Sequence, residues 1–173
     1  DFSNADLDNN ILAMRNQFGM ASYPVQSIKY QTRSGVNQVV SSNLYKYTNL
    51  PAGKLLLGEK TELRISKPMD FNTYADFTNY RPITGPTSGL YAFSDKLTFD
   101  NSSNLVQFEK PDIITSYIWD YSQSYPIAAA VNAAPSEIAY TSFEGDGFGN
   151  WDNFSGIFTT PTASSFAPNS KKY

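Results

Sequence analysis

The spacing of apolar residues near the start of the chain predicts one helix. Leu7, Ile11 and Met14 recur at intervals of three and four residues, which places them on a single helical face. We therefore expect a helix over residues 4–17. Gly19 would end this helix, because glycine readily adopts the left-handed conformation found just after helix ends.

Beyond the helix, apolar and polar residues alternate with a period of two, which is typical of β-strands with one buried face. Turn-forming residues such as Ser34-Gly35 divide this alternation into short segments. Residues 66–89 contain three Pro and several Asn and Thr, and they predict a long connecting loop. The aromatic residues expected to anchor this loop are Phe71, Tyr74, Phe77 and Tyr80. The strands are predicted over residues 23–31, 38–47, 55–65, 91–99, 105–110, 113–119 and 138–143.

The composition agrees with a mainly β fold. Twelve Tyr, twelve Phe and two Trp accompany many Asn, Ser and Thr. Aromatic residues and Thr favour pleated, half-buried surfaces, whereas Asn and Ser favour turns. We therefore expect an antiparallel β protein of 173 residues with one short helix near its N-terminus.

The charge and the missing residue types exclude several classes of function. The net charge is −3 and the 13 Lys and Arg are dispersed, so we expect no nucleic-acid partner. The chain has no Cys and no His, which excludes disulfides, thiol nucleophiles, Cys/His zinc sites and a Ser-His-Asp triad. The apolar runs are much shorter than the roughly 18 residues needed to cross a bilayer, so no membrane span is expected.

Two aromatic–acid pairs form a short repeat. Phe99-Asp100 and Trp119-Asp120 lie twenty residues apart, and an apolar or aromatic residue precedes each pair by two positions (Leu97 and Tyr117). Between the pairs lie a polar turn, a short strand, a second turn and another strand. Such regular spacing is typical of repeated supersecondary units.

This region resembles the YD (RHS-type) repeat, in which an aromatic–Asp pair, a turn ending in Gly-Asn and two strands recur about every twenty residues. The matching segments are LTFDNSSNL (97–105), SYIWDY (116–121), YPIA (125–128) and IAYTSFE (138–144). The last three are similar to the end of the RHS-like region in large secreted proteins of the Bacteroidota. Two positions depart from the pattern, since Ser103 and Asp120 stand where the family has Gly.

The resemblance implies a fold class and a role. Residues 1–134 would be the end of a YD/RHS-like array of antiparallel hairpins, and residues 135–173 a connecting strand and the truncated start of a following β-sandwich module. The chain would then be a non-enzymatic structural part of a large exported protein, a type IX secretion substrate located extracellularly or at the cell surface. It would serve as scaffold, adhesin or encapsulating shell. No catalytic residues accompany the signature.

The expected partner is the rest of the parent chain, or another surface or secretion protein, paired along the open edges of the sheet. A different class of function is a carbohydrate-binding module that uses exposed aromatic side chains. Alternation would place Tyr117, Trp119 and Tyr121 on one strand face beside Asp120, where they could stack on glycan together with Trp151. The alternative is that this aromatic face is the core of the sheet, because aromatic side chains bury large areas.

Two further sets of polar residues have possible chemistry. Asp146, Asn150 and Asp152 lie in a Gly-rich loop and could supply oxygen ligands to a structural Ca²⁺, although the spacing is not that of an EF-hand and a solvated turn is the alternative. No other cofactor is expected. Acid pairs for glycoside hydrolysis can be named, Glu59 with Glu62 or Asp120 with Glu144, but nothing in the sequence places either pair in a cleft.

Overall fold

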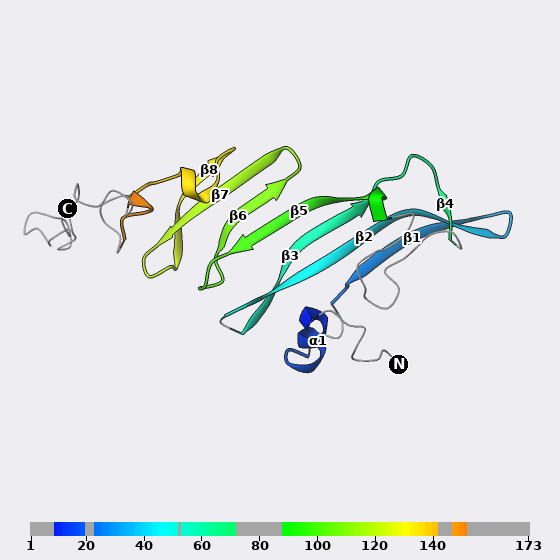
Figure 1. Cartoon of the computed structure of the whole chain (residues 1–173), viewed down its shortest axis with the longest axis horizontal. Helices are drawn as coiled ribbons and strands as arrows, with labels where there is room; N and C mark the ends of the chain where they lie inside the picture. Colours follow the sequence, from blue (N-terminus) through cyan, green and yellow to red (C-terminus); the bar gives the residue numbers. More distant parts are fainter. Residues whose placement is uncertain (1–8, 20–22, 52, 72–87, 142–146, 152–173) are drawn as a thin grey trace, which may run out of the picture. The chain divides into compact units, whose positions relative to one another are not determined.

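The computed structural model describes residues 9–19, 23–51, 53–71, 88–141 and 147–151 of the chain. The fold is mainly β, as the sequence predicts, with one antiparallel sheet of eight strands and one short α-helix among the described residues (Figure 1). No helix in these ranges has the length and apolar character needed to cross a membrane. The elements are α1 (Asn9–Asn16), β1 (Gln26–Arg33), β2 (Val36–Leu50), β3 (Lys54–Leu63), β4 (Met69–Asp70), η3 (Ser88–Leu90), β5 (Tyr91–Phe99), β6 (Leu105–Lys110), β7 (Ile113–Asp120), β8 (Tyr125–Val131) and η4 (Pro135–Glu137).

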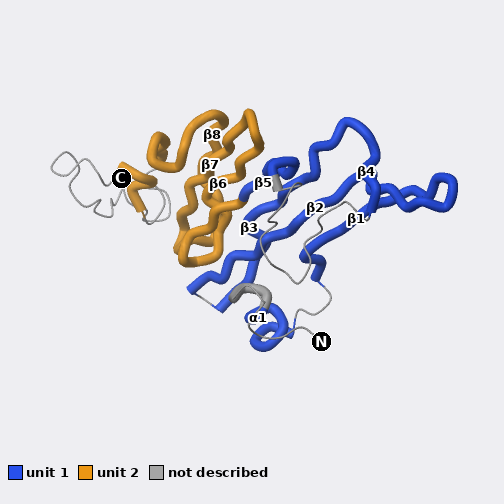
Figure 2. Tube along the Cα trace, turned by 45° about the vertical axis from the view of Figure 1, so that its right-hand side comes forward, with its two compact units in different colours: residues 1–96 blue, residues 97–173 orange. Residues whose placement is uncertain are grey.

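The strands follow one another in the sheet almost as they do in the sequence. Their order is β1-β2-β3-β5-β6-β7-β8, and β4 pairs separately with β2. The chain divides into two compact units, residues 1–96 and residues 97–173 (Figure 2). The module boundary predicted at residue 135 stays a prediction. We refer to these parts as unit 1 and unit 2.

Unit 1 begins with α1, which occupies the second half of the predicted helix; residues 4–8 lie outside the described ranges. Gly19 has a φ of 61°, the left-handed conformation expected after the helix. The β1–β2 hairpin turns at Ser34 and Gly35, whose φ angles are 51° and 76°. Two successive positive φ values match the right-handed twist of the flanking strands, so this two-residue turn was correctly predicted.

Two apolar clusters stabilise unit 1. In the first, Met14 of α1 packs with Tyr47 of β2 and Leu55 of β3, so the helix covers this part of the sheet. In the second, Val39 of β2 packs with Leu63 of β3. The buried positions of β2 (39, 42, 44, 47 and 50) and of β3 (55, 58 and 63) do not recur strictly at every second residue, so burial is not confined to one alternating face of these strands.

The predicted loop over 66–89 is described only at its ends. It contains the two-residue strand β4, which pairs with Gln38 and Val39 of β2. Phe71 is the one predicted anchor within the described residues, and it is 39% exposed, with its ring edge-on to Tyr30 at 6.3 Å. Tyr74, Phe77 and Tyr80 lie outside the described residues.

Unit 2 differs from the prediction in two strands. The strand β8 was not predicted, because its Ala-rich sequence has little strand propensity; pairing with β7 from Asp120–Tyr125 to Thr115–Val131 supplies its hydrogen bonds instead. The strand predicted over 138–143 is wrong as far as it is described, since residues 138–141 belong to no strand. There the backbone bonds to a loop rather than to a strand, because Tyr140 N donates to Gly149 O at 2.8 Å.

Candidate functional site

The two aromatic–acid pairs of the repeat lie at equivalent places in unit 2. Phe99 ends β5 and Trp119-Asp120 ends β7, and a tight turn follows each pair. The Asn104 side chain in the first turn donates from Nδ2 to Gln123 O in the second turn at 2.8 Å. The two turns are therefore joined directly by a side-chain hydrogen bond.

Asp100 organises the first turn. Its Oδ1 accepts hydrogen bonds from Ser102 N and Asn104 N, both at 2.8 Å, and its Oδ2 accepts one from Asn104 Nδ2 at 3.3 Å. Ser103 has a φ of 72°. The turn therefore keeps a left-handed position without glycine, and the Asp100 carboxylate holds the surrounding amides in place.

Asp120 organises the second turn and is only 4% exposed. Its Oδ1 accepts hydrogen bonds from Tyr121 N at 2.7 Å and from Gly147 N at 3.1 Å. A buried carboxylate is tolerated where amide donors compensate its lost hydration. Asp120 thus ties the β7–β8 turn to a loop 27 residues further along the chain.

The β7–β8 turn has an unusual backbone. Tyr121, Ser122 and Gln123 have φ angles of 53°, 55° and 61°, so three successive residues with side chains are left-handed. Each such residue costs roughly 1–2 kcal/mol relative to the right-handed conformation. Ser124 N compensates in part by donating to Asp120 O at 3.0 Å and to Tyr121 O at 3.2 Å.

The predicted aromatic face is split by this turn. Tyr117 and Trp119 share one face of β7, but Tyr121 lies in the turn, where the strand alternation has ended, and its ring packs edge-on against Tyr125. The more deeply buried face of β7 carries Ser116, Ile118 and Asp120, whereas Tyr117 and Trp119 are half-buried. The expectation that the aromatic face is the core of the sheet is therefore not met.

Trp119 is fixed by a hydrogen bond as well as by packing. Its indole Nε1 donates to Leu105 O of β6 at 2.8 Å. This bond holds the ring across the neighbouring strand, because a half-buried indole N–H needs an acceptor.

A pocket of about 490 Å³ lies in unit 2 beside these side chains. It brings together three of the predicted site residues, Tyr117 and Trp119 from the glycan set and Asn150 from the calcium set. Tyr121 and Trp151 do not line it, although both are half-buried residues of the same unit. The lining residues are Asp100, Val106, Tyr117, Ile118, Trp119, Asp120, Ser122, Gln123, Pro135, Gly147, Phe148, Gly149 and Asn150.

The predicted calcium site is described at one of its three residues. Asn150 donates from Nδ2 to Pro135 O at 3.1 Å and to Ile138 O at 3.0 Å, so its side chain fastens the 147–151 loop to η4. Asp146 and Asp152 lie outside the described residues. Within the described ranges no group of three or more acidic side chains is arranged to hold a metal ion.

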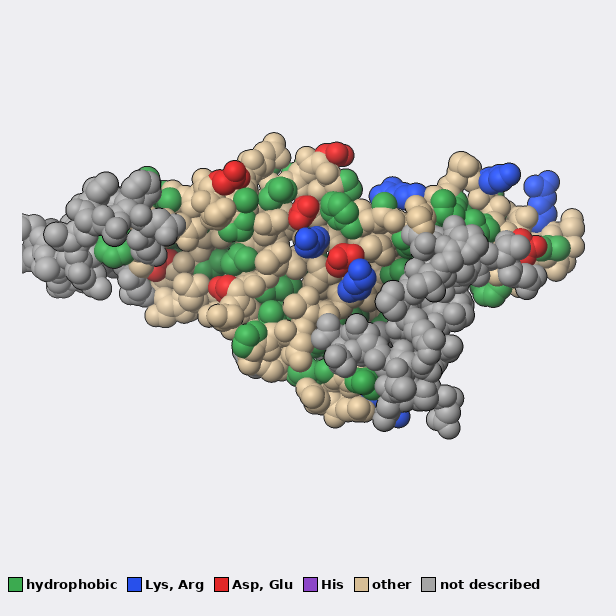
Figure 3. Space-filling view, in the orientation of Figure 1, with side chains coloured by type: hydrophobic (Ala, Val, Ile, Leu, Met, Phe, Trp, Pro, Cys, Tyr) green, Lys and Arg blue, Asp and Glu red, His purple; other side chains and the backbone are tan. Residues whose placement is uncertain are grey.

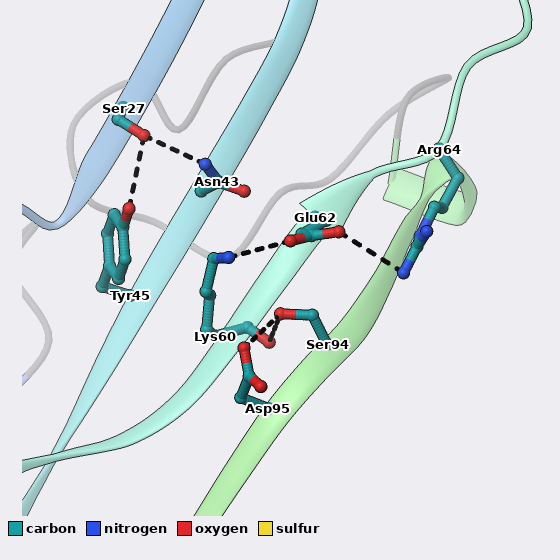
Figure 4. A network of polar contacts seen from close by, with 8 residues as sticks. All are labelled: Ser27, Asn43, Tyr45, Lys60, Glu62, Arg64, Ser94 and Asp95. Atoms are coloured by element: carbon teal, nitrogen blue, oxygen red, sulfur yellow. Dashed lines mark hydrogen bonds and ion pairs between the residues drawn. The ribbon is translucent and has the colours of Figure 1, made fainter. Parts of the chain in front are cut away.

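The acids of the predicted pair Glu59 and Glu62 each form an ion pair in unit 1. Lys46 Nζ lies 3.0 Å from a Glu59 carboxylate oxygen. Lys60 Nζ lies 2.8 Å from a Glu62 carboxylate oxygen (Figure 4). The Lys60 hydrogen bond lowers the pKa of Glu62 below its usual value, and the pKa of Lys60 is raised by the same bond. Arg64 adds a second cation to Glu62 at 3.4 Å. Glu144, proposed as a partner of Asp120, lies outside the described residues.

Some of the surface charges of unit 1 thus lie in pairs of opposite sign. Figure 3 shows acidic and basic side chains next to each other on the face that it presents. Ser94 extends the network by donating from Oγ to Asp95 at 2.9 Å (Figure 4). Among the side chains drawn in Figure 4, Lys60 and Arg64 both pair with Glu62, and Asp95 accepts a hydrogen bond from Ser94.

Sequence reasoning missed the residues that complete the pocket. The sequence gives no signal that Gly147 N meets Asp120, because the contact depends on how the chain returns after η4. The role of Asn104 had a weak signal, since the run Asp-Asn-Ser-Ser-Asn is typical of turns stabilised by side-chain hydrogen bonds. Comparisons with protein-family models, with curated proteins and with solved structures found no match for this chain.

Proposed function

We propose that this chain is a non-enzymatic structural and interaction segment of a large exported protein, built as a hairpin array of YD (RHS) type. The observation that supports the proposal is that the side chains of the repeat residues form hydrogen bonds with the backbone. Asp100 and Asp120 both accept hydrogen bonds from backbone amides, and the Trp119 indole donates to the backbone of β6. Residues that recur every twenty positions here hold turns and strands together.

The direct link between the two turns adds to this support. The Asn104–Gln123 hydrogen bond joins the turn after β5 to the turn after β7. A side chain that connects consecutive units is expected in a repeat array, where each unit is stabilised mainly by its neighbours.

The proposed mode of interaction is strand addition at a sheet edge. In the strand order β8 is the last strand, and Tyr125 and Val131 at its two ends are 65% and 63% exposed. An edge strand offers backbone groups to a further strand, and Pro126 is tolerated there because it needs no partner for an amide hydrogen. The occupant that we propose is a strand of the same parent protein, or of another surface or secretion protein.

A cell-surface or extracellular location and export by type IX secretion are part of the same proposal, and they rest on the YD/RHS resemblance. The test is protease treatment of intact cells that produce the native protein, followed by detection with antibodies against this chain. We expect the epitope to disappear without lysis. An epitope that survives until the cells are lysed contradicts export to the surface.

The edge contact is tested separately by hydrogen exchange. We expect the amides of β8 that are not bonded to β7 to exchange rapidly in the isolated chain and slowly in the native parent protein. β2 serves as an internal control, because it pairs with both β1 and β3 and should be protected in both samples. Equal exchange of β8 in the two samples would refute pairing at this edge.

A further inference from the structure

The β1–β2 hairpin of unit 1 extends beyond the strands that support it (Figure 1). β3 pairs with β2 over residues 43–50, and β4 pairs with β2 only at Gln38 and Val39. All nine residues from 29 to 37 are exposed. Two strands alone form a marginally stable sheet, so this segment, which we call the hairpin arm, would be stabilised by a further strand.

The outer side of β1 is open to such a strand. β1 is the first strand in the sheet order and pairs only with β2 among the described strands. Arg33 and Val36 flank the two-residue turn, and residues in these positions are hydrogen-bonded to each other. Bonded and non-bonded pairs then alternate along an antiparallel ladder. The backbone groups of Tyr30 and Thr32 are therefore expected to point away from β2.

The two faces of the hairpin arm differ in chemistry. Tyr30 and Thr32 share one face, on which the Tyr30 ring lies edge-on to Phe71 at 6.3 Å. Lys29 and Arg33 share the other face, four residues apart. A strand added beside β1 would thus meet an aromatic ring on one face and two cations on the other.

The charge of the two cations is not balanced nearby. Residues 9–58 contain five Lys and Arg but no Asp or Glu. Lys29 and Arg33 form no ion pair with any residue that the structure describes. Asp70 is the one acid in β1, β2 and β4, and it lies across β2 from the open side of β1. Opposite charges stabilise a cross-strand pair and like charges destabilise it, so the edge of β1 selects an acidic strand.

The chain does not itself contain a matching strand. Two carboxylates that face Lys29 and Arg33 from one added strand must also be four residues apart, and no two acids in the 173 residues have this spacing. Charged residues on an edge strand also discourage pairing with unsuitable chains. The matching strand is therefore expected in a different polypeptide rather than in a second copy.

We propose that the hairpin arm binds an extended acidic segment of a partner protein as an added antiparallel strand. Two acids four residues apart in this segment pair with Lys29 and Arg33, and an apolar residue on its other face packs against Tyr30. The proposal concerns the edge formed by β1, and it does not rest on export or on the pairing proposed at β8.

The test is a titration of fluorescently labelled peptides with the whole chain, followed by anisotropy. The acidic peptide is Thr-Glu-Val-Thr-Tyr-Glu-Thr, in which the two Glu lie opposite Arg33 and Lys29. A control peptide, Thr-Val-Glu-Thr-Glu-Tyr-Thr, has the same composition, but its acids are two residues apart and only one can meet a cation. We expect the acidic peptide to bind roughly fivefold more tightly, the effect of one cross-strand charge pair.

A charge reversal separates strand recognition from general attraction. Lys29→Glu combined with Arg33→Glu should abolish binding of the acidic peptide and permit binding of Thr-Lys-Val-Thr-Tyr-Lys-Thr. Both residues are exposed, so the melting temperature should hold. Arg15→Glu combined with Lys54→Glu is the matched control, because it changes the net charge equally at exposed residues outside β1. It should keep the preference for the acidic peptide.

The proposal is overturned if the acidic peptide does not bind, if both orders of acids bind equally, or if the Lys29 and Arg33 double variant keeps the native preference. Vesicles of phosphatidylglycerol that displace the acidic peptide would assign the hairpin arm to a membrane surface instead. None of these results bears on the cell-surface location or on the exchange of β8, so the two proposals fail independently.

Discussion

The two units stabilise the same kind of sheet by different means. In unit 1 the described buried side chains are mostly apolar, with Met14, Tyr47 and Leu55 in one cluster and Val39 and Leu63 in another. In unit 2 the described buried side chains of β7 are Ser116, Ile118 and Asp120, of which two are polar. Ser116 donates from Oγ to Ala133 O at 2.6 Å and Asp120 accepts from two amides.

The difference shows how the described strands of unit 2 are held with few fully buried apolar side chains. Burial of apolar area is non-directional, so the clusters of unit 1 tolerate changes of shape that keep volume. Hydrogen bonds to turns are directional, so unit 2 depends on particular atoms at particular places. The charges differ as well: residues 1–96 hold ten Lys and Arg against eight Asp and Glu, whereas residues 97–173 hold three against eight.

The largest expected effect is the loss of apolar packing in unit 1. Leu55→Ala should lower the free energy of unfolding by about 3 kcal/mol, because it leaves a cavity between α1 and the sheet. Both tryptophans of the chain belong to unit 2, so the shift should appear in far-UV circular dichroism and hardly at all in tryptophan fluorescence. Leu56→Ala is the control, as Leu56 is only half-buried. Equal shifts in both signals would mean that the units unfold as one.

The next effect is the loss of a single carboxylate in unit 2. Asp120→Ala should cost roughly 2–3 kcal/mol, since two amides lose a charged acceptor. Urea unfolding followed by tryptophan fluorescence measures this change. Asp120→Asn keeps an oxygen acceptor and should recover most of the stability, and Asp112→Ala, an exposed acid in the β6–β7 turn, should have almost no effect. A cost for Asp120→Ala no larger than that for Asp112→Ala would contradict the role of the buried carboxylate.

A smaller effect concerns the polar end of a core residue in unit 1. Tyr47→Phe removes the hydrogen bond from its hydroxyl to Pro24 O at 2.9 Å and should cost about 1 kcal/mol. Burial raises the pKa of Tyr47 above 10.0, with smaller contributions from Tyr45 and Tyr23. The raised pKa therefore contributes stability that is complete below pH 10.0 and is lost as the pH rises through the folded-state pKa.

Urea midpoints measured by circular dichroism over the alkaline range test this pH dependence. The gap between the native chain and Tyr47→Phe should narrow as the pH rises above 10.0. The pKa of Lys60 is also raised, but Lys60 is present in both proteins, so the difference isolates Tyr47. A constant gap would show that Tyr47 titrates alike in the folded and unfolded chains.

The smallest effect belongs to the surface ion pairs. Glu62→Gln should cost less than about 1 kcal/mol, because the Glu62 and Lys60 side chains remain 32% and 25% exposed and solvent screens them. Since the pKa of Glu62 is lowered from 4.5, its contribution is present above pH 4.5 and is lost as the pH falls through the folded-state pKa. The difference in melting temperature between the native chain and Glu62→Gln should disappear in acid and in high salt. A difference that survives both treatments would have a non-electrostatic origin.

Sequence reasoning performed best where one local rule decides the structure. Ser34-Gly35 specifies its own turn, and the strand over residues 91–99 was placed correctly by its alternation of side chains. It failed where partners far along the chain decide. The Ala-rich β8 is a strand because β7 pairs with it, and residues 138–141 are not one because Gly149 and the Asn150 side chain take their backbone groups.

Some residues of the candidate pocket were predicted from the sequence, but the fact that they lie together was not. Tyr117 and Trp119 were chosen correctly as neighbours because alternation puts them on one strand face. Asn150 was assigned to a separate calcium site, since nothing local connects it with β7. The left-handed run 121–123 could not be predicted from the sequence, because Tyr, Ser and Gln have no preference for positive φ angles.

The run 121–123 is a short stretch of left-handed conformation built from L-amino acids. For D-amino acids the left-handed conformation is the relaxed one, so chirality itself becomes a probe of this turn. A chain with D-Ser at 122 and D-Gln at 123 can be assembled by chemical ligation. Its side chains would point in altered directions, but the left-handed backbone at these two positions would be free of strain. Its stability should rise above that of the natural chain, and the same inversion placed inside β2 should prevent the strand from forming.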